Sequence, residues 1–330
     1  MDLKKICLTP TRNEAWILPI FLKLAEQWAD HIIIMDQCST DDTRKIAAAH
    51  PKVRLIENDD PTYDEAFRQK TLIDAAREIA GKRLIFALDA DEAFSANWLS
   101  SEEWNSVCQS EVGTRFRLHW VSPFADLERC SVTGPKIYGF MDDGSDHEGS
   151  QIHSIRVPEK ADAPLFQLDE IVLLHFDRLS VRRMAIKRAW YQCWELVNSS
   201  GLSTVDIVRG YYERKEFSRE TSEVFQEQWY QAFSQLDIQL DNIDDSESTW
   251  WEHDILKLFQ QYGAHHFRNI TIWDIPWSKI AEGAGLDSRI AQDPRGFHHQ
   301  LYHSWLTGTQ HCRHLIFVRL IDALLRRLFT

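Results

Sequence analysis

The chain has 330 residues, of which 44% are hydrophobic and 12% aromatic, and a formal net charge of −13. This length and composition allow a sizeable core and exclude a disordered chain. The acidic balance disfavours wide contact with nucleic acid, because binding to phosphates requires a basic surface. No apolar run reaches the roughly 18 to 20 residues of a membrane span, and the first residues lack a signal-peptide pattern, so we expect a cytoplasmic protein.

The first 92 residues alternate between short apolar runs and helical patterns, which predicts successive βα units and a parallel sheet. Ser39 and Asp42 form a variant of the capping box at the start of the second helix, and Gly81 is the expected glycine after the third. The expected strands are residues 6–9, 32–36, 53–57 and 84–88, and the expected helices are 14–28, 39–49 and 64–80.

The pattern changes twice along the rest of the chain. Extended pieces are expected at residues 116–121, 136–140, 152–157 and 171–176, and part of them should extend the sheet. Residues 141–150 are polar and glycine-bearing, which fits either a mobile loop near a site or a solvated connection. After residue 180 the patterns are helical, at 181–198, 222–236, 249–262 and 312–329. We therefore predict a first domain at 1–178 and a mainly helical region at 179–330.

The last helical pattern carries apolar residues on one side and several arginines beside them. Such a helix suits a membrane surface or a partner's groove, which would place the protein peripherally at the inner face of a membrane. The simpler interpretation is a helix packed on its own domain. The apolar residues are Leu315, Val318, Ile321, Leu325 and Leu328, and the arginines are Arg313, Arg319, Arg326 and Arg327.

Polar clusters follow three of the expected strands, at residues 9–14, 36–43 and 89–92. In a parallel sheet these clusters converge on one edge, where open α/β sheets bind ligands. Asp36 can accept hydrogen bonds from a base or ribose, and Arg12 can bind a base edge or a phosphate. Asp91 can ligate Mg²⁺ or Mn²⁺, which prefer oxygen ligands and often take one or two carboxylates plus phosphate oxygens.

These clusters resemble those of a family 2 glycosyltransferase with the GT-A fold, a Rossmann-like, mostly parallel sheet flanked by helices. The matching segments are Arg-Asn-Glu at 12–14, Asp-Gln-Cys-Ser-Thr-Asp-Asp-Thr at 36–43 and Leu-Asp-Ala-Asp-Glu at 88–92. The resemblance implies that Asp36 binds the nucleoside base, that Asp89 contacts the ribose or the metal, and that Asp91 ligates the metal. The alternatives are a loop cap for Asp36 and a turn without ligand for the aspartate pair.

The resemblance also implies further ligands of a UDP- or GDP-type sugar donor, and these are Thr9, Arg12, Glu14, Arg68 and Ala90. Arg12 and Arg68 are alternatively surface ion pairs. His175 ends an apolar run and resembles the additional metal or diphosphate ligand of some members of this fold, with a buried core histidine as the alternative. Lys187 and Tyr191 are spaced to face a phosphate or acceptor, although a solvated helix face is the simpler interpretation.

Inverting sugar transfer needs a group that takes the proton of the acceptor hydroxyl. The family's usual Glu-Asp or His-Glu pair is not evident downstream of the metal motif. The candidates are Asp146 and Glu148 beside His147, the pair at 169–170, and His153. Asp146 is favoured, and a solvated loop is the alternative reading of this segment.

Three other interpretations are weaker. A haloacid-dehalogenase-type phosphatase also uses Asp-x-Asp, with Lys136 and the acidic pair at 142–143 as further parts, but its motif usually follows the first strand. A non-catalytic module that binds sugar nucleotides or glycans is the second. The third is zinc bound by His299 and His303, although no carboxylate or cysteine completes that set. The six scattered cysteines indicate reduced thiols.

The sequence thus predicts a metal-dependent, inverting glycosyltransferase of hexosyltransferase type. The expected cofactor is Mn²⁺ or Mg²⁺, and the expected partners are a nucleotide-diphospho-sugar donor and a glycan or lipid-linked acceptor. A role in polysaccharide biosynthesis is what the resemblance implies.

Overall fold

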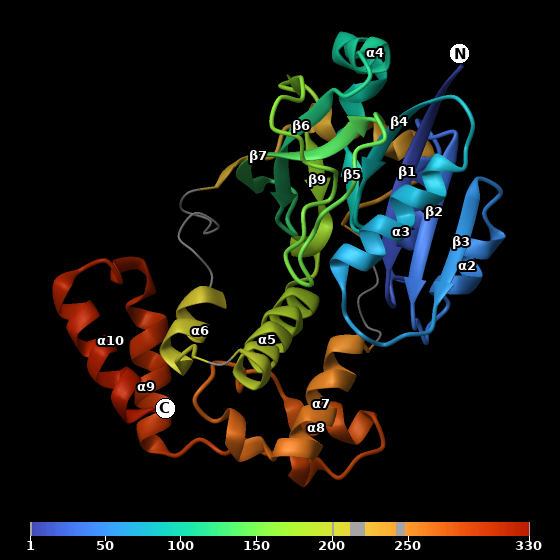
Figure 1. The fold of residues 1–330 in the computed structure, drawn as a ribbon. Coiled ribbons are helices and arrows are strands. Elements are labelled where there is room, and N and C mark those ends of the chain that lie inside the picture. Colours follow the sequence, from blue (N-terminus) through green and yellow to red (C-terminus); the bar gives the residue numbers. More distant parts are fainter. Residues whose placement is uncertain (1, 200, 212–221, 242–247, 330) are drawn as a thin grey trace. The chain divides into compact units, whose positions relative to one another are not determined.

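The computed structural model describes residues 2–199, 201–211, 222–241 and 248–329. The chain forms two compact units, shown in Figure 1 with the chain coloured from blue to red. The first unit comprises Met1–Leu179 and Glu223–Asp244, and the second comprises Ser180–Ser222 and Asp245–Thr330. The first unit is therefore discontinuous in sequence.

Within the described residues, the first unit is built on a ten-stranded sheet in the order β3-β2-β1-β4-β7-β6-β9-β5, with β10 paired to β7 and β8 to β6. The strands β3, β2, β1 and β4 are parallel, and β7 runs antiparallel to both β4 and β6. The strands are β1 (Leu3–Thr11), β2 (His31–Gln37), β3 (Val53–Asn58), β4 (Lys82–Ala87), β5 (Glu92–Phe94), β6 (Arg115–Pro123), β7 (Arg129–Met141), β8 (Leu165–Gln167), β9 (Leu173–His175) and β10 (Glu223–Val224).

Helices cover both faces of the parallel part of this sheet (Figure 1). Successive side chains of a strand point to opposite faces. On β1, Cys7 packs in the cluster that contains α1, whereas Ile6 and Leu8 pack in the cluster that contains α3. The helices and 3-10 turns of this unit are α1 (Leu18–Ala25), α2 (Thr43–Ala49), α3 (Glu65–Arg77), η1 (Ala96–Ser100), α4 (Glu102–Gln109), η2 (Phe176–Leu179), η5 (Glu227–Trp229) and η6 (Gln231–Leu236).

The predicted fold class, a GT-A-type α/β sheet flanked by helices with a helical appendage, is confirmed by this architecture. Each of the four predicted strands of the first 92 residues forms; β1, β2 and β4 carry buried apolar runs, and the apolar residues of β3, at the sheet edge, are partly buried. The first helix begins at Leu18 rather than at 14, with Pro19 in its first turn, where proline is favoured. Helix α3 ends at Arg77 rather than at 80, with Glu78 as its C-cap, so the predicted glycine end is wrong and Gly81, with φ of 118°, lies in the turn before β4.

The predicted strand at 152–157 is wrong, because this segment forms no strand. Backbone groups of this segment and of Gln151 just before it form hydrogen bonds with Glu65 at the start of α3 instead. The amide of Glu65 donates to the carbonyl of Gln151 (3.0 Å), and the amide of Ser154 donates to the Glu65 carboxylate (2.8 Å). His153 has φ of 57°, which is incompatible with an extended strand.

The predicted helix at 222–236 is also wrong. The segment begins with β10, which pairs with β7, and continues as the short turns η5 and η6. Phe225, Trp229 and Phe233 are spaced by four residues, which resembles a helical stripe, and all three are buried in one cluster with β5, β9 and α1 residues. The turns η5 and η6 therefore bury apolar residues at the same four-residue spacing that a helix would show.

The predicted capping box at the start of α2 does not form. Asp42 is the N-cap residue but its side chain makes no capping bond. The hydroxyl of Ser39 donates to Asp36, so it is not available to the helix. Asp41 accepts from the amide of Thr43 instead (3.0 Å).

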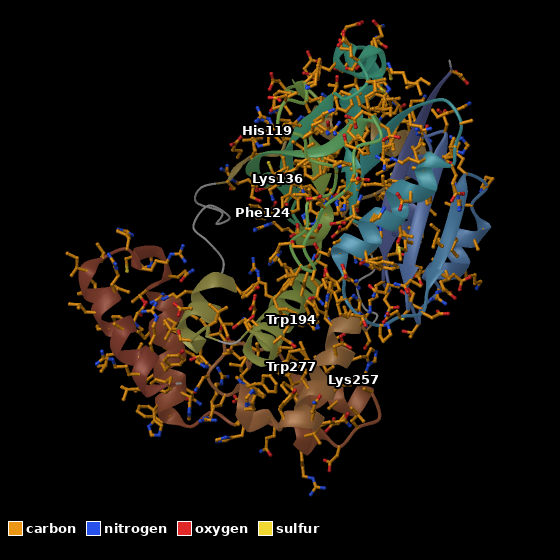
Figure 2. The ribbon with its side chains drawn as sticks, viewed as in Figure 1. His119, Phe124, Lys136, Trp194, Lys257 and Trp277 are labelled. Carbon is orange, nitrogen blue, oxygen red and sulfur yellow. The ribbon has the colours of Figure 1, made fainter. Side chains whose placement is uncertain are left out.

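The second unit is helical and has an aromatic core that includes Trp190, Trp250 and Trp277, the last of which is labelled in Figure 2. None of the described helices of the chain combines the length and the apolar character needed to cross a membrane. The helices and 3-10 turns of this unit are α5 (Val181–Asn198), α6 (Thr204–Tyr211), α7 (Trp250–Tyr262), η7 (Ala264–Phe267), α8 (Trp277–Gly283), η8 (Ser288–Ala291), α9 (Phe297–Gly308), η9 (Gln310–Cys312) and α10 (Ile316–Leu328).

Candidate active site

The carboxyl ends of β1, β2 and β4 lie side by side, as the parallel register requires. Thr11 is opposite Asp36 on β1 and β2, and Leu8 is opposite Ala87 on β1 and β4. Asp89 follows β4 two residues later. The polar clusters predicted to converge therefore do share one edge of the sheet.

Asp36 is fully buried, and its carboxylate is surrounded by donors of the protein. Oδ1 accepts from the amide of Ser39 (3.2 Å) and from Nε of Arg44, and Oδ2 accepts from the hydroxyls of Thr11 (3.2 Å) and Ser39. A carboxylate has about four lone-pair sites, so these bonds occupy them. A nucleoside base can reach Asp36 only by displacing a hydroxyl.

Arg44 holds this carboxylate in an ion-pair network at the edge of the sheet. Its guanidinium also donates to Glu57 and Asp59, each at 2.9 Å. Hydrogen bonds to Asp36 and Asp59 raise the pKa of Arg44, which therefore stays charged. Sequence reasoning did not single out Arg44, although a lone basic residue among acidic ones in 36–44 is a visible signal.

Asp89 is held by an arginine that comes from the segment wrongly predicted as a strand. Nη2 of Arg156 lies 2.6 Å from Oδ2 of Asp89 and 3.1 Å from Oε1 of Glu92, and Nη1 contacts the other Glu92 oxygen. Glu92 is buried and accepts from the amide of Asp89 (2.8 Å). Burial raises the pKa of Glu92, against the opposing charge of Arg156.

Asp91 lies on the other side of this turn, against His175. The β5–β9 pairing sets Glu92 opposite His175, and the amide of Phe176 donates to the carbonyl of Asp91 (2.8 Å). Nε2 of His175 is 3.2 Å from Oδ2 of Asp91, and its Nδ1 is 3.0 Å from Oδ1 of Asp177. The structure thus brings together Asp91 and His175, which are 84 positions apart in the printed sequence.

The environment of His175 is apolar on one side and acidic on the other. Its ring lies on Trp120, with 4.5 Å between the ring centroids, and the side chain is buried. Burial by itself lowers the pKa of His175, but the carboxylates of Asp177 and Asp91 raise it to about 10. The carboxylates of Asp91 and Asp177 therefore stabilise a positive charge at the position of the His175 ring.

The donors that fit a divalent cation are the Asp91 carboxylate and Nε2 of His175, which must lose its proton when it binds a metal. Among the described residues, no group of three or more histidines, cysteines and carboxylates is arranged to hold a metal ion. Two protein donors nevertheless suit Mg²⁺ or Mn²⁺ when the remaining ligands are diphosphate oxygens and water. Asp89, in contrast, is paired with Arg156, so the two aspartates of the motif have different partners.

The other predicted donor-binding residues lie on β1 or just after it, in the turn after β4 and in α3. Thr9 and Ala90 are buried. The amide of Glu14 donates to the Thr43 hydroxyl (2.8 Å), and Arg68, in the first turn of α3, lies over the ring of Tyr63 at 5.5 Å. Arg12 directly follows β1 and is half-buried.

The loop at 141–157 is tied to α3 and β4. Asp142 pairs with Arg77 (3.0 Å) and Arg83 (2.9 Å), which lowers its pKa despite burial. Asp146 and His153 are both exposed, and His153 lies three residues before Arg156. The described contacts lead from this loop to Asp89 through Arg156.

The remaining sequence candidates lie elsewhere. Glu103 of α4 accepts the backbone amides at 169–171, so that acidic pair belongs to a turn beside α4. Lys187 lies over Trp251 at 5.6 Å, and Tyr191 stacks on Tyr211, so both join the aromatic core of the second unit. The zinc interpretation has no support among the described histidines.

Lys136 is a cation beside the site that the glycosyltransferase interpretation did not include. Lys136 is labelled in Figure 2. Its Nζ lies 4.5 Å from the centre of the Trp120 ring, the ring that also covers His175. Burial and the charge of Arg156 lower the pKa of Lys136.

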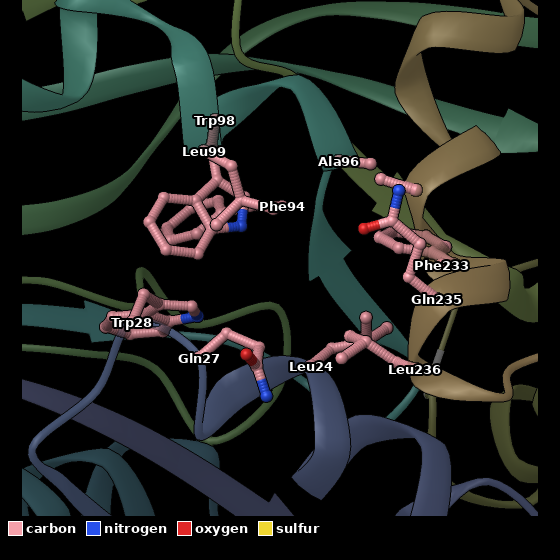
Figure 3. A pocket seen from close by; sticks show the side chains of 11 residues that line it. Leu24, Gln27, Trp28, Phe94, Ala96, Trp98, Leu99, Phe233, Gln235 and Leu236 are labelled. Carbon is pink, nitrogen blue, oxygen red and sulfur yellow. The ribbon is translucent and has the colours of Figure 1, made fainter.

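A separate apolar cavity of about 140 Å³ lies between the end of α1, η1 and η6 (Figure 3).

Residues 7–101 match the family model described as Glycosyl transferase family 2. This segment is therefore similar to glycosyltransferase family 2. The match covers less than half of the chain and contains Arg12, Asp36, Asp89 and Asp91, while His175 and Arg156 lie beyond it. No curated protein matches the chain.

Solved structures of low similarity include glucosyl-3-phosphoglycerate synthase from Mycobacterium tuberculosis in complex with Mn²⁺, uridine diphosphate and phosphoglyceric acid. It is 16% identical, with a TM-score of 0.27, over 36% of this chain and 43% of that one. The inositol-1-phosphate CTP transferase from T. maritima is 12% identical, with a TM-score of 0.32, over 55% and 93%. At these scores the likeness carries no functional assignment.

Proposed function

We propose that the chain transfers a sugar from a UDP- or GDP-type sugar donor to a glycan or lipid-linked acceptor, with inversion at the sugar. The observation that supports this most is the approach of His175 to Asp91 at the end of a family 2 segment. The proposed divalent cation is Mn²⁺ or Mg²⁺. When bound, it neutralises charge on the leaving diphosphate.

The residues around this cation have separate proposed roles. Asp91 and His175 hold it, and Asp177 orients the imidazole through Nδ1, as carboxylates commonly do for metal-bound histidines. Asp89 and Arg156 form a fixed pair beside the ribose. Asp36 shapes the nucleoside pocket together with Thr11 and Ser39, and contacts the base when one of those hydroxyls turns away.

The donor's other contacts are proposed to come from Thr9, Arg12, Glu14, Arg68 and Ala90. For removal of the acceptor proton we retain Asp146 and His153. The position of His153 near Arg156 supports it, because Arg156 reaches Asp89 at the edge of the sheet. The exposed side of Asp146 suits a loop that meets an acceptor from solvent.

The test measures release of UDP or GDP from a panel of nucleotide sugars, with and without Mn²⁺, together with the thermal shift that each donor causes. A bound ligand raises stability with the logarithm of its excess over Kd. Asp91→Asn should abolish the Mn²⁺-dependent shift and lower turnover by about a hundredfold or more. Asp42→Asn, an exposed aspartate at the start of α2, is the matched control and should leave both unchanged.

Two outcomes would contradict the proposal. A Mn²⁺-dependent shift that persists in Asp91→Asn would overturn the metal role of Asp91. Donor binding without any release of nucleotide, in the presence of a broad acceptor mixture, would instead favour a non-catalytic sugar-nucleotide module.

A further inference from the structure

Helix α10 has two faces with different surroundings. One face packs within the second unit, where Val318 is 0% and Asp322 is 5% exposed. The other face projects five large apolar side chains into solvent. They are Ile316 (77% exposed), Phe317 (55%), Leu320 (67%), Leu324 (55%) and Leu328 (65%).

This exposed face is continuous along the helix. Residues 316, 320 and 324 are four apart, and 317 and 328 fall on the same side at about 100° per residue. Exposed apolar residues scattered singly are ordinary on a protein surface, but a contiguous stripe indicates an interaction site. We define residues 316, 317, 320, 324 and 328 as the α10 apolar face.

The charge around the α10 apolar face is opposite to that of the whole chain. The sequence from 311 to 329 contains four arginines and a single acidic residue, Asp322. Asp322 is buried and paired with Arg209, with an Nη2–Oδ1 distance of 2.9 Å. Arg319 and Arg327 are exposed beside the apolar face. A basic surface therefore borders it, although the chain carries a net charge of −13.

We propose that the α10 apolar face binds the surface of an anionic lipid bilayer, with the helix lying in the plane of the interface. An amphipathic helix with leucine and phenylalanine on one face and arginine beside it inserts its apolar side among the acyl chains. Its arginines meet the lipid phosphates, each contributing about fivefold in affinity. With 13 residues, α10 is too short to span the hydrocarbon core of roughly 30 Å.

Charge argues against a second copy of the chain as the occupant. A two-fold contact through α10 would bring Arg319 and Arg327 of both copies into one interface, and like charges gathered at an interface weaken it. A bilayer of anionic lipids offers the opposite charge and an apolar interior together. This inference rests on the second unit alone and does not depend on the proposed sugar transfer.

The test is flotation of the full chain with lipid vesicles. One set contains phosphatidylcholine and phosphatidylglycerol in equal parts, and the other contains phosphatidylcholine alone. We expect the chain to float with the anionic vesicles, at a lipid concentration about tenfold or more below that needed with the neutral ones. Raised salt should weaken this binding, because salt screens the charges of lipid and arginine.

Two variants and one control separate the contributions of apolar contact and of charge to lipid binding. Leu320→Asp combined with Leu324→Asp should raise the lipid concentration for half-binding by about tenfold or more. Arg319→Ser combined with Arg327→Ser should remove most of the preference for anionic lipid. Leu202→Asp is the control, because Leu202 is 49% exposed in the same unit but lies outside α10.

Several results would overturn the proposal. These are no flotation of the unaltered chain, equal binding to neutral vesicles, or unchanged flotation of the double leucine variant. A dimer seen by light scattering that dissociates in the leucine variant would identify the face as a contact between copies. Circular dichroism checks that the variants fold, which we expect because both leucines are more than half exposed.

Discussion

At the scale of single residues, the candidate site is organised by ion pairs between carboxylates and arginines from distant parts of the chain. Asp36 is bound by Arg44, and Asp89 and Glu92 by Arg156. Each arginine neutralises a carboxylate that burial would otherwise destabilise. Asp91 lies beside His175, with 3.2 Å between Oδ2 of Asp91 and Nε2 of His175. This pair of side chains can offer one oxygen and one nitrogen ligand to a cation.

Arg156 is expected to be essential for stability as well as for the site. Arg156→Met leaves the fully buried Glu92 without its counter-charge, which costs about 3 to 5 kcal/mol of unfolding free energy. Urea unfolding measures this loss. Arg54→Met is the control, because Arg54 and its partner Glu78 are both largely exposed, and it should cost no more than about 1 kcal/mol. Equal losses for the two variants would contradict this account.

His303 gives the second unit a predictable response to acid. Burial, helped by Arg295, lowers the pKa of His303 to about 4, below the usual value of 6.5. The unfolded chain therefore takes up a proton between pH 6.5 and 4 that the folded chain does not, so stability is lost as the pH falls through this window. At pH 4.5 the loss from this residue is about 2 kcal/mol relative to pH 7.

His303→Gln should reduce the difference in unfolding free energy between pH 7 and pH 4.5 by that amount, because glutamine does not titrate. Urea unfolding at the two pH values provides the comparison. His298→Gln, at an exposed position of the same helix, should leave the difference unchanged. A pH dependence of His303→Gln equal to that of the unaltered chain would show that His303 does not carry this effect.

At the scale of elements, the sequence predicted best those strands and helices whose own apolar residues are packed into a core. The four parallel strands and α5 form close to their expected ranges, because each places its own apolar residues in a core. Residues 152–157 and 222–236 failed because their partners are remote. Arg156 is directed to Asp89, and Phe233 joins a core built from β5 and β9. Local spacing cannot reveal contacts of that kind.

The same distinction applies to the candidate site. Asp36, Asp89 and Asp91 were predictable, because strand ends of a parallel sheet meet at one edge. The partners of Asp89 and Asp36 were not, since Arg156 and Arg44 form pairs that only the folded chain defines. His175 was predictable as a candidate, from its place at the end of an apolar run.

Helix α10 depends on one buried ion pair. Asp322 accepts two hydrogen bonds from Arg209 and one from the indole of Trp305 (3.0 Å). Asp322→Ala leaves Arg209 buried without a counter-charge and should cost about 3 to 5 kcal/mol in urea unfolding. Asp206→Ala breaks a comparable pair with Arg326 that is about 40% exposed, and should cost no more than about 1 kcal/mol. A smaller loss for Asp322→Ala than for Asp206→Ala would disprove the role of the buried pair.

At the scale of the whole molecule, the first unit is completed by a segment that follows the start of the second. Phe225, Trp229, Phe233, Ile238 and Leu240 are buried in a cluster with residues of α1, β5 and β9. The predicted boundary at residue 178 misses this return of the chain, because the helical pattern of the second unit begins there.

A fragment that ends at residue 179 should therefore fold poorly. Removing the returning segment exposes the apolar surface that these five side chains cover, at a cost of roughly 25 cal/mol for each Å² of apolar surface. We expect the fragment to aggregate or to bind a hydrophobic dye, and adding a peptide of residues 222–241 should restore solubility in part. A soluble fragment with a sharp unfolding transition would refute the dependence on this segment.

This interrupted order has a consequence for biosynthesis. The ribosome synthesises α5 and α6 before Phe225 and the buried residues that follow it. The apolar surface that these residues cover in the first unit therefore stays exposed while more than forty codons are translated. During that interval a chaperone is the natural cover for this surface.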